Sequence, residues 1–367
     1  AMVEFLARNG PRSETELWIE KLESLAPAPP KNDGDLMARI VELRIKLNTL
    51  DQCTNWLDRL EAAEPGRIRP FILRAKLLVA QGQPQEAIAN LDAKADELLL
   101  AAKEQKEQVE IVKAVGDFYF SSDLATSAET WYGRLAKLDP EQAPLAILAL
   151  AREQRMTEAI RLCIARSQND ETARYAIVAA AVLAESPAES DASALADPLF
   201  ASALKRFPGN INLLYSLGTL RVAQGRYGEA VNLFRETITK SPRHVPALNN
   251  LALILSESPA TRAEALQLID RAIAVVGENP SLLDTKGAIL IYGGQASAAL
   301  PLLQTAARGS AVDPRHQLHL AAAYQGTAQS QLARDMLKLA LDQKIEKLIL
   351  TQTDKNLLAD LRGRLGL

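Results

Sequence analysis

The stretch INLLYSLGTLRVAQGRYGEAVNLFRETITKSP, residues 211–242, contains two apolar patterns of helical period with a glycine between them. On each side of Gly225 the apolar residues recur three or four positions apart, which is the spacing of one face of an α-helix. Glycine is common just beyond a helix end. The stretch therefore predicts two antiparallel helices. Their apolar faces are Leu214, Leu217, Gly218 and Val222, followed by Ala230, Leu233, Phe234 and Ile238.

The second of these patterns recurs along the chain. An alanine returns at spacings of 35, 34 and 34 residues, and a large apolar residue follows each alanine by four positions. A fixed period of this length indicates a stacked array of one helix-pair unit rather than a domain with a single core. The predicted fold class is therefore all-α, an α-solenoid of antiparallel helix pairs. The alanines are Ala230, Ala265, Ala299 and Ala333, and the large residues are Phe234, Ile269, Leu303 and Leu337.

Small residues also recur near the middle of each first helix. Two packed helices have axes about 8–10 Å apart, so the point of closest approach has room for no more than a methyl group. We expect these residues to lie at that point and the alanines above to lie opposite them, buried. The small residues are Gly218, Ala252, Gly287 and Ala321.

This pattern resembles the tetratricopeptide repeat (TPR) family, in its bacterial multi-repeat form. In residues 211–242 the resemblance is carried by Leu217-Gly218, Ala230, Phe234 and Pro242; Thr237 departs from it, because a small apolar residue is usual there. It implies a right-handed superhelix whose first helices line a concave groove. Two further units match through Gly116, Tyr119, Ala128, Tyr132 and Pro140, and through Tyr324, Ala333, Leu337 and Ala340.

The repeat divides the chain into three expected parts: a partial repeat at residues 1–33, about nine helix pairs over residues 34–350, and a capping helix over residues 351–367. The pairs are irregular between about residues 94 and 198, where we expect two long helices around Lys94–Glu107 and a loop over Ser186–Ser193. Pro242 is expected to start a helix. The segment from Met2 starts without a capping residue, which suggests a portion of a longer chain.

Composition narrows the function classes. The formal net charge is −3, so the chain has no broad basic field and nucleic-acid binding is not expected. It contains no apolar run of 18 residues for a membrane span. Cys53 and Cys163 are each on an apolar stripe and are interpreted as reduced core thiols. A cytoplasmic location is favoured, and a periplasmic one stays open if a signal precedes this sequence.

Residues for catalysis or metal binding are sparse. His316 and His319 are three apart on one predicted helix, but the nearest third ligand is Asp313, which is expected to cap that helix. The sequence has neither a nucleophile placed with a histidine nor a glycine-rich phosphate loop. We therefore expect a non-enzymatic protein without cofactor or metal.

The predicted groove is most informative in its C-terminal half, where the outward positions of the first helices are polar and mostly neutral. Asparagine amides both donate and accept hydrogen bonds, so they can pair with the backbone of an extended peptide. The alternative is that Asn249 and Asn250 are simply solvated. A clamp for a terminal carboxylate is not supported, because Ser281 and Thr285 occupy the places where it needs basic residues. The candidate site is Tyr215, Ser216, Thr219, Asn249, Asn250, Asp284 and His319.

These observations lead to one hypothesis and two alternatives. The hypothesis is a scaffold that binds an extended segment of a partner protein or peptide in its concave groove. The first alternative is the TPR arm of a larger enzyme or of an envelope or export assembly protein. The second is self-association, through repeat edges or through the apolar stretch Leu148–Val178.

Overall fold

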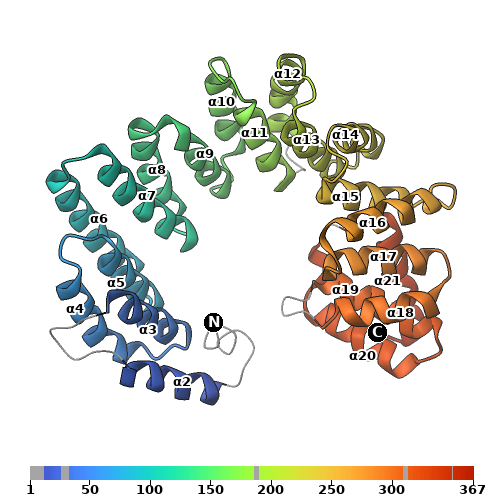
Figure 1. Ribbon diagram of the computed structural model, residues 1–367, viewed down its shortest axis with the longest axis horizontal. Helices are drawn as coiled ribbons and strands as arrows, with labels where there is room; N and C mark the ends of the chain where they lie inside the picture. The colour runs from blue at the N-terminus through green and yellow to red at the C-terminus, as the bar shows by residue number, and fades with distance from the viewer. Residues whose placement is uncertain (1–11, 26–32, 186–189, 309–312, 349) are drawn as a thin grey trace. The chain divides into compact units, whose positions relative to one another are not determined.

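A computed structural model describes residues 12–25, 33–185, 190–308, 313–348 and 350–367. Within these ranges the regular structure consists of α-helices and three short 3-10 helices, without a β-strand (Figure 1). Successive helices pack as antiparallel pairs, so the predicted all-α solenoid of helix pairs is confirmed. The chain forms two compact units, residues 1–162 and 163–367.

The first unit carries three well-formed pairs, α3 with α4, α5 with α6 and α7 with α8. The long helices expected around Lys94–Glu107 are present, since α6 has 18 residues and α7 has 17. The helices are α2 (Arg12–Leu25), α3 (Gly34–Lys46), α4 (Cys53–Ala63), α5 (Arg69–Ala80), α6 (Pro84–Ala101), α7 (Gln105–Ser121), α8 (Ala125–Leu138) and α9 (Ala143–Arg152), with α10 (Met156–Ser167) crossing into the second unit, and the 3-10 helices are Leu50–Gln52 and Pro140–Gln142.

The second unit contains the regular repeats. Helix α13 pairs with α14, α15 with α16, α17 with α18 and α19 with α20. The remaining helices are α11 and α12 before these pairs and α21 after them. Their bounds are α11 (Arg174–Glu185), α12 (Ser190–Arg206), α13 (Ile211–Ala223), α14 (Tyr227–Lys240), α15 (Val245–Ser256), α16 (Arg262–Val276), α17 (Pro280–Tyr292), α18 (Ala296–Ala306), α19 (Pro314–Gly326), α20 (Ser330–Asp342) and α21 (Gln352–Leu365), with a 3-10 helix at Ile345–Lys347.

The small residues of the first helices lie where the two helices of a pair touch. A Cβ added at Gly218 would lie 2.6 Å from Cε1 of Phe234, and one at Gly116 would lie 2.6 Å from Cε1 of Tyr132. A Cβ at Gly287 would be 2.5 Å from Leu303. The steric reason inferred from the sequence is therefore confirmed at these glycines, but the side chains opposite them are Phe234, Tyr132 and Leu303 rather than the alanines. The alanines are fully buried: Ala230, Ala265, Ala299 and Ala333.

Two local expectations need correction. Pro242 does not start a helix, because α14 ends at Lys240 with Ser241 as its C-cap, and α15 begins only at Val245 with His244 as its N-cap. The predicted loop over Ser186–Ser193 is partly wrong, since residues 190–193 form the first turn of α12, while residues 186–189 lie outside the described ranges.

The turn at Gly225 is confirmed by its positive φ of 72°.

Helix α21 follows the last pair and buries one face against it. Leu358, Leu361 and Leu365 pack into the same cluster as Leu337 of α20 and Leu318 of α19. Capping of the array by this helix stays a prediction, as does the partial repeat at residues 1–33, of which residues 1–11 and 26–32 are not described. The expected division into three parts likewise stays a prediction.

Two predictions made from the composition concern the cysteines and membrane-spanning helices. Cys53 and Cys163 are both buried and unpaired. Burial raises the pKa of Cys53 to about 11 and that of Cys163 to about 12, which keeps both as thiols at neutral pH. In the described residues, no helix combines the length and the apolar character that crossing a bilayer requires.

Candidate functional site

A pocket of about 480 Å³ opens within the second unit, along the first helices of four successive pairs. Its wall is formed by side chains from each of α13, α15, α17 and α19. Ala184 at the end of α11 also contributes, as do Leu350, Thr351 and Asp354 at and just before the start of α21. The polar residues of this wall are Thr219, Tyr227, Asn249, Asn250, Glu257, Ser281, Asp284, Thr285, Asp313, Arg315, His316, His319, Thr351 and Asp354.

Four polar residues in this wall form a ladder at the repeat spacing. Asn249, Asp284, His319 and Asp354 are each 35 residues apart and lie on α15, α17, α19 and α21. Asn249 and Asp284 are the fifth residues of their helices, His319 is the sixth and Asp354 is the third, so stacking of the repeats brings them together. The last three are in direct contact, which makes the ladder the polar centre of the pocket.

His319 is bound between two carboxylates. Its Nδ1 lies 2.9 Å from Oδ1 and 3.0 Å from Oδ2 of Asp284, and its Nε2 lies 2.9 Å from Oδ1 of Asp354. A carboxylate accepts hydrogen bonds, so both ring nitrogens must carry protons and the imidazole is cationic. Only 3% of His319 is exposed. Burial alone would lower the pKa of His319, but Asp284 and Asp354 outweigh it and raise that pKa to about 10.

Asp354 is tied down from several directions. Burial would raise the pKa of its carboxyl, but the His319 cation and hydrogen bonding to the side chains of Tyr292 and Thr351 lower it to about 2. Nearby, Oε2 of Glu257 accepts from the backbone N–H of Thr353 at 3.2 Å and from its hydroxyl at 2.7 Å. These bonds hold the first turn of α21 against α15, α17 and α19, where it closes one end of the pocket.

The structure brings together most of the residues predicted from the sequence. Thr219, Asn249, Asn250, Asp284 and His319 all line this pocket. Asp284 and His319 are buried, at 7% and 3% exposure, and are bonded to each other instead of facing solvent as a groove surface would.

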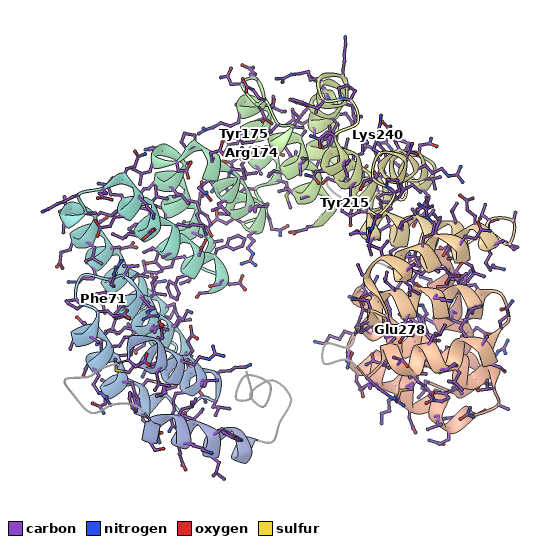
Figure 2. All side chains as sticks on the ribbon, viewed as in Figure 1. Phe71, Arg174, Tyr175, Tyr215, Lys240 and Glu278 are labelled. Atoms are coloured by element: carbon purple, nitrogen blue, oxygen red, sulfur yellow. The ribbon has the colours of Figure 1, made fainter. Side chains whose placement is uncertain are left out.

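Two of the predicted residues lie apart from the pocket wall. Tyr215 of α13, labelled in Figure 2, packs its ring against His244 at 4.9 Å and Phe234 at 5.9 Å between centroids. Ser216 is half-buried on the same helix and does not reach the pocket. The tyrosine thus contributes mainly to packing between α13, α14 and the start of α15.

Sequence reasoning missed several wall residues. Asp354 was assigned only to a terminal helix, although its spacing of 35 residues from His319 was a usable signal. Glu257 and Arg315 are at helix ends, where the repeat spacing does not indicate whether a side chain points into the pocket. Asp313 caps α19 as predicted, accepting from the N–H of Arg315 at 2.9 Å, and its carboxylate also binds the guanidinium of Arg315.

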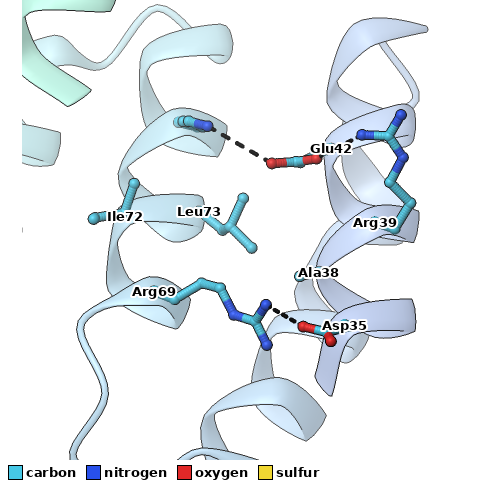
Figure 3. A pocket seen from close by; sticks show the side chains of 8 residues that line it. Asp35, Ala38, Arg39, Glu42, Arg69, Ile72 and Leu73 are labelled. Carbon is cyan, nitrogen blue, oxygen red and sulfur yellow. Dashed lines mark hydrogen bonds and ion pairs between the residues drawn. The ribbon is translucent and has the colours of Figure 1, made fainter. Parts of the chain in front are cut away.

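A smaller pocket of about 190 Å³ lies in the first unit between α3 and α5 (Figure 3). Its charged side chains pair with one another. Arg69 Nη1 donates to Asp35 at 2.5 Å, Arg39 Nη1 donates to Glu42 at 3.0 Å, and Lys76 lies 3.9 Å from Glu42. Mutual pairing of this kind is typical of a solvated helix face, so the larger pocket is the better candidate site.

The larger pocket offers little for catalysis. Both nitrogens of His319 are committed to carboxylates, so the ring cannot accept a proton from a substrate. Across the described part of the chain, no group of three or more histidine, cysteine or acidic side chains is arranged to hold a metal ion.

Comparison with known proteins gives one informative sequence match. No family model matches the chain. Over 146 residues, 40% of this chain, it is 29% identical to a Pseudomonas aeruginosa protein described as TPR repeat-containing protein PA4667. The match spans 24% of that protein, about a quarter of its length.

Solved structures with a similar course of the chain have low sequence identity. A tetratricopeptide repeat protein from Parabacteroides merdae is 14% identical, with 68% of this chain and 97% of that one covered at a TM-score of 0.48. Yeast Tom70 is 13% identical, with coverage of 100% and 94% and a TM-score of 0.49.

The likeness of this chain to tetratricopeptide repeat proteins is carried by its own repeats and by the Pseudomonas match. Helix pairs recur at 34 or 35 residues, with Gly218 against Phe234 and Gly287 against Leu303 at the close contacts. Gly218 and Phe234 are among the positions that carry the resemblance in the sequence. In these respects the chain is similar to tetratricopeptide repeat proteins.

Proposed function

We propose that the chain is a non-catalytic scaffold that binds an extended segment of a partner protein in the pocket of the second unit. The observation that carries the proposal is the pocket wall itself, in which polar side chains from four successive first helices, α13, α15, α17 and α19, line one continuous cavity. Repeat arrays commonly use such extended concave surfaces for binding.

The dimensions suit a peptide in an extended conformation. Neighbouring packed helices are about 8–10 Å apart, so four first helices span roughly 24–30 Å. An extended chain rises about 3.3 Å per residue, and about eight residues would cross this distance. Asn249 and Asn250 line the pocket midway, where their amides can donate to and accept from a peptide backbone.

A second possibility is that this array is one arm of a longer protein. The Pseudomonas relative is about four times the length of the matched region, and this observation favours the possibility of a longer protein. The groove would then recruit a partner to whatever activity the remainder carries.

Selection from a random octapeptide library displayed on phage, followed by calorimetry with the synthesised consensus peptide, tests the groove. The variant Asn249→Ala/Asn250→Ala should bind about tenfold more weakly at an unchanged melting temperature. The matched control is Asn232→Ala/Gln267→Ala, which removes two exposed amides from the second helices α14 and α16 and should bind normally. Recovery of no peptide, or equal weakening by both double variants, would contradict the proposal.

A further inference from the structure

The pocket wall carries more negative than positive charge. Carboxylates of Glu257, Asp284, Asp313 and Asp354 line it, against the cations Arg315 and His319. Asp313 is neutralised by Arg315, and one of the two aspartates that hold His319 is balanced by it. Four carboxylates against these two cations leave two negative charges uncompensated inside a concave surface, where the field of a charge is least screened by water.

Three atoms in the same wall have no hydrogen-bond partner. They are Oδ1 of Asn249, Oε1 of Glu257 and Nδ1 of His316, each shielded from water. His316 is only 7% exposed, and its Nε2 faces Asp284 at 3.9 Å, which favours the proton on Nε2 and leaves Nδ1 as an acceptor. An unpartnered buried acceptor is costly, so three on one pocket call for a ligand that donates hydrogen bonds.

All three unpartnered atoms are therefore acceptors, and the surplus charge of the wall is negative. A ligand that satisfies both conditions is a cation with several N–H donors. Arginine carries five donors in a planar group and stays charged at any physiological pH, whereas lysine has three donors on a compact ammonium.

The apolar part of the wall suits the same side chain. Leu253, Ile254 and Val222 offer surface to an aliphatic stem, and the ring of Tyr227, which is 44% exposed, lies at the same pocket. Arginine stacks its guanidinium on aromatic faces and buries its stem along apolar surface. A carboxylate ligand would instead meet Glu257 and find Arg315 already held by Asp313.

We propose that this pocket receives the guanidinium of an arginine in the partner's extended segment, with Asn249, Glu257 and His316 as its acceptors. This inference rests on the proposed function, because it presumes that a peptide occupies the groove. It adds the chemistry by which a partner would be recognised.

The test uses four fluorescent octapeptide pools, random except for a fixed central arginine, lysine, citrulline or glutamate, titrated by anisotropy. Citrulline keeps the shape of arginine and removes its charge. The arginine pool should bind at least tenfold more tightly than the citrulline pool and several-fold more tightly than the lysine pool. The glutamate pool should bind most weakly.

Variants connect the preference to the named acceptors. Glu257→Gln should reduce the ratio of arginine to citrulline affinity severalfold, and Asn249→Asp, which keeps an acceptor and adds a negative charge, should increase it. The matched control Glu236→Gln, on the exposed face of α14, should leave the ratio unchanged. Circular dichroism of each variant checks that it is folded.

The outcomes separate the two proposals. If no pool binds, the groove function itself fails. If all pools bind equally, or lysine equals arginine, or Glu257→Gln and Asn249→Asp keep the wild-type ratio, the groove function stands and the arginine assignment is overturned.

Discussion

Nε2 of His319 lies 2.9 Å from Oδ1 of Asp354, and this contact joins the middle of α19 to the first turn of α21. On its other side the same ring donates to Asp284 of α17. One buried cation thus links three helices that are neighbours in the array but 35 residues apart in sequence. Removal of one member of such a group leaves uncompensated buried charge, which is strongly destabilising.

The link predicts a particular pH dependence. The pKa of His319 rises from its ordinary 6.5 to about 10 on folding, so its contribution to stability is complete below about pH 6.5 and is lost as pH rises through 10. The pKa of Asp354 falls from 3.8 to about 2, so its contribution is complete above about pH 3.8 and is lost as pH falls through 2. Stabilisation by this pair is therefore greatest between about pH 3.8 and 6.5.

Thermal melts of the wild type and His319→Gln across pH 2–10 measure this dependence. The difference in melting temperature between the two proteins should be largest near pH 5 and should shrink toward both extremes. Hydrogen exchange of α21 should accelerate in the variant. A difference that is the same at every pH would show that His319 does not act through its charge.

The close contact at Gly218 predicts an unusual substitution effect. Alanine normally stabilises a helix interior by about 0.5–1 kcal/mol relative to glycine. At Gly218 its methyl would lie 2.6 Å from the ring of Phe234, so Gly218→Ala should instead destabilise by roughly 1–3 kcal/mol. Gly228→Ala in α14, where an added Cβ would meet no side chain or other element within 4 Å, is the control and should be neutral or stabilising.

A second substitution identifies the cause. Phe234→Leu shortens the opposing side chain, and in the double variant Gly218→Ala/Phe234→Leu part of the loss should be recovered. Urea denaturation of the single and double variants measures this coupling. Strictly additive losses would mean that the contact with Phe234 is not responsible.

In the first unit, Asp92 of α6 accepts from two aromatic side chains of the next pair. The Tyr119 hydroxyl and the Trp131 indole N–H both donate to Oδ1 of Asp92, each at 2.7 Å. Asp92→Leu leaves the buried indole donor without an acceptor and should cost about 1–3 kcal/mol. Asp92→Asn keeps an acceptor oxygen and should cost less.

Asp96, one turn further along α6, provides the control. It pairs with Arg134 at 2.6 Å on the surface, and exposed pairs contribute about 0–1 kcal/mol. Denaturation of the purified variants should rank Asp92→Leu well below Asp96→Leu in stability. Equal stabilities would contradict the role given to Asp92.

Much of the fold could be predicted from spacing alone. Gly218 and Phe234, which are in contact, are 16 positions apart within one unit. Pairs with this spacing recur from repeat to repeat, so they can be recognised in the sequence. The pocket was harder to predict. Asn249, Asp284 and His319 were identified as groove residues, but the burial of Asp284 and His319 arises only when α21 contributes Asp354.

For Tyr215 the sequence predicted a ligand contact that the structure does not show. Its position on a first helix suggested a ligand contact, yet its ring packs on Phe234 and His244. Which way an amphipathic side chain turns depends on the ring that the next unit places beside it, here His244 at the start of α15. The spacing of residues in one sequence does not predict the direction in which such a side chain points.

The most direct measurement for the account is photo-crosslinking from inside the pocket. A benzophenone amino acid placed at Asn250, and separately at Asn232 on α14 as the outer control, would be irradiated with the selected octapeptide and the adducts located by mass spectrometry. The account predicts an adduct from position 250 that unlabelled peptide competes away, and none from position 232. Equal adducts at both positions, or none at 250 while the peptide still binds, would contradict it.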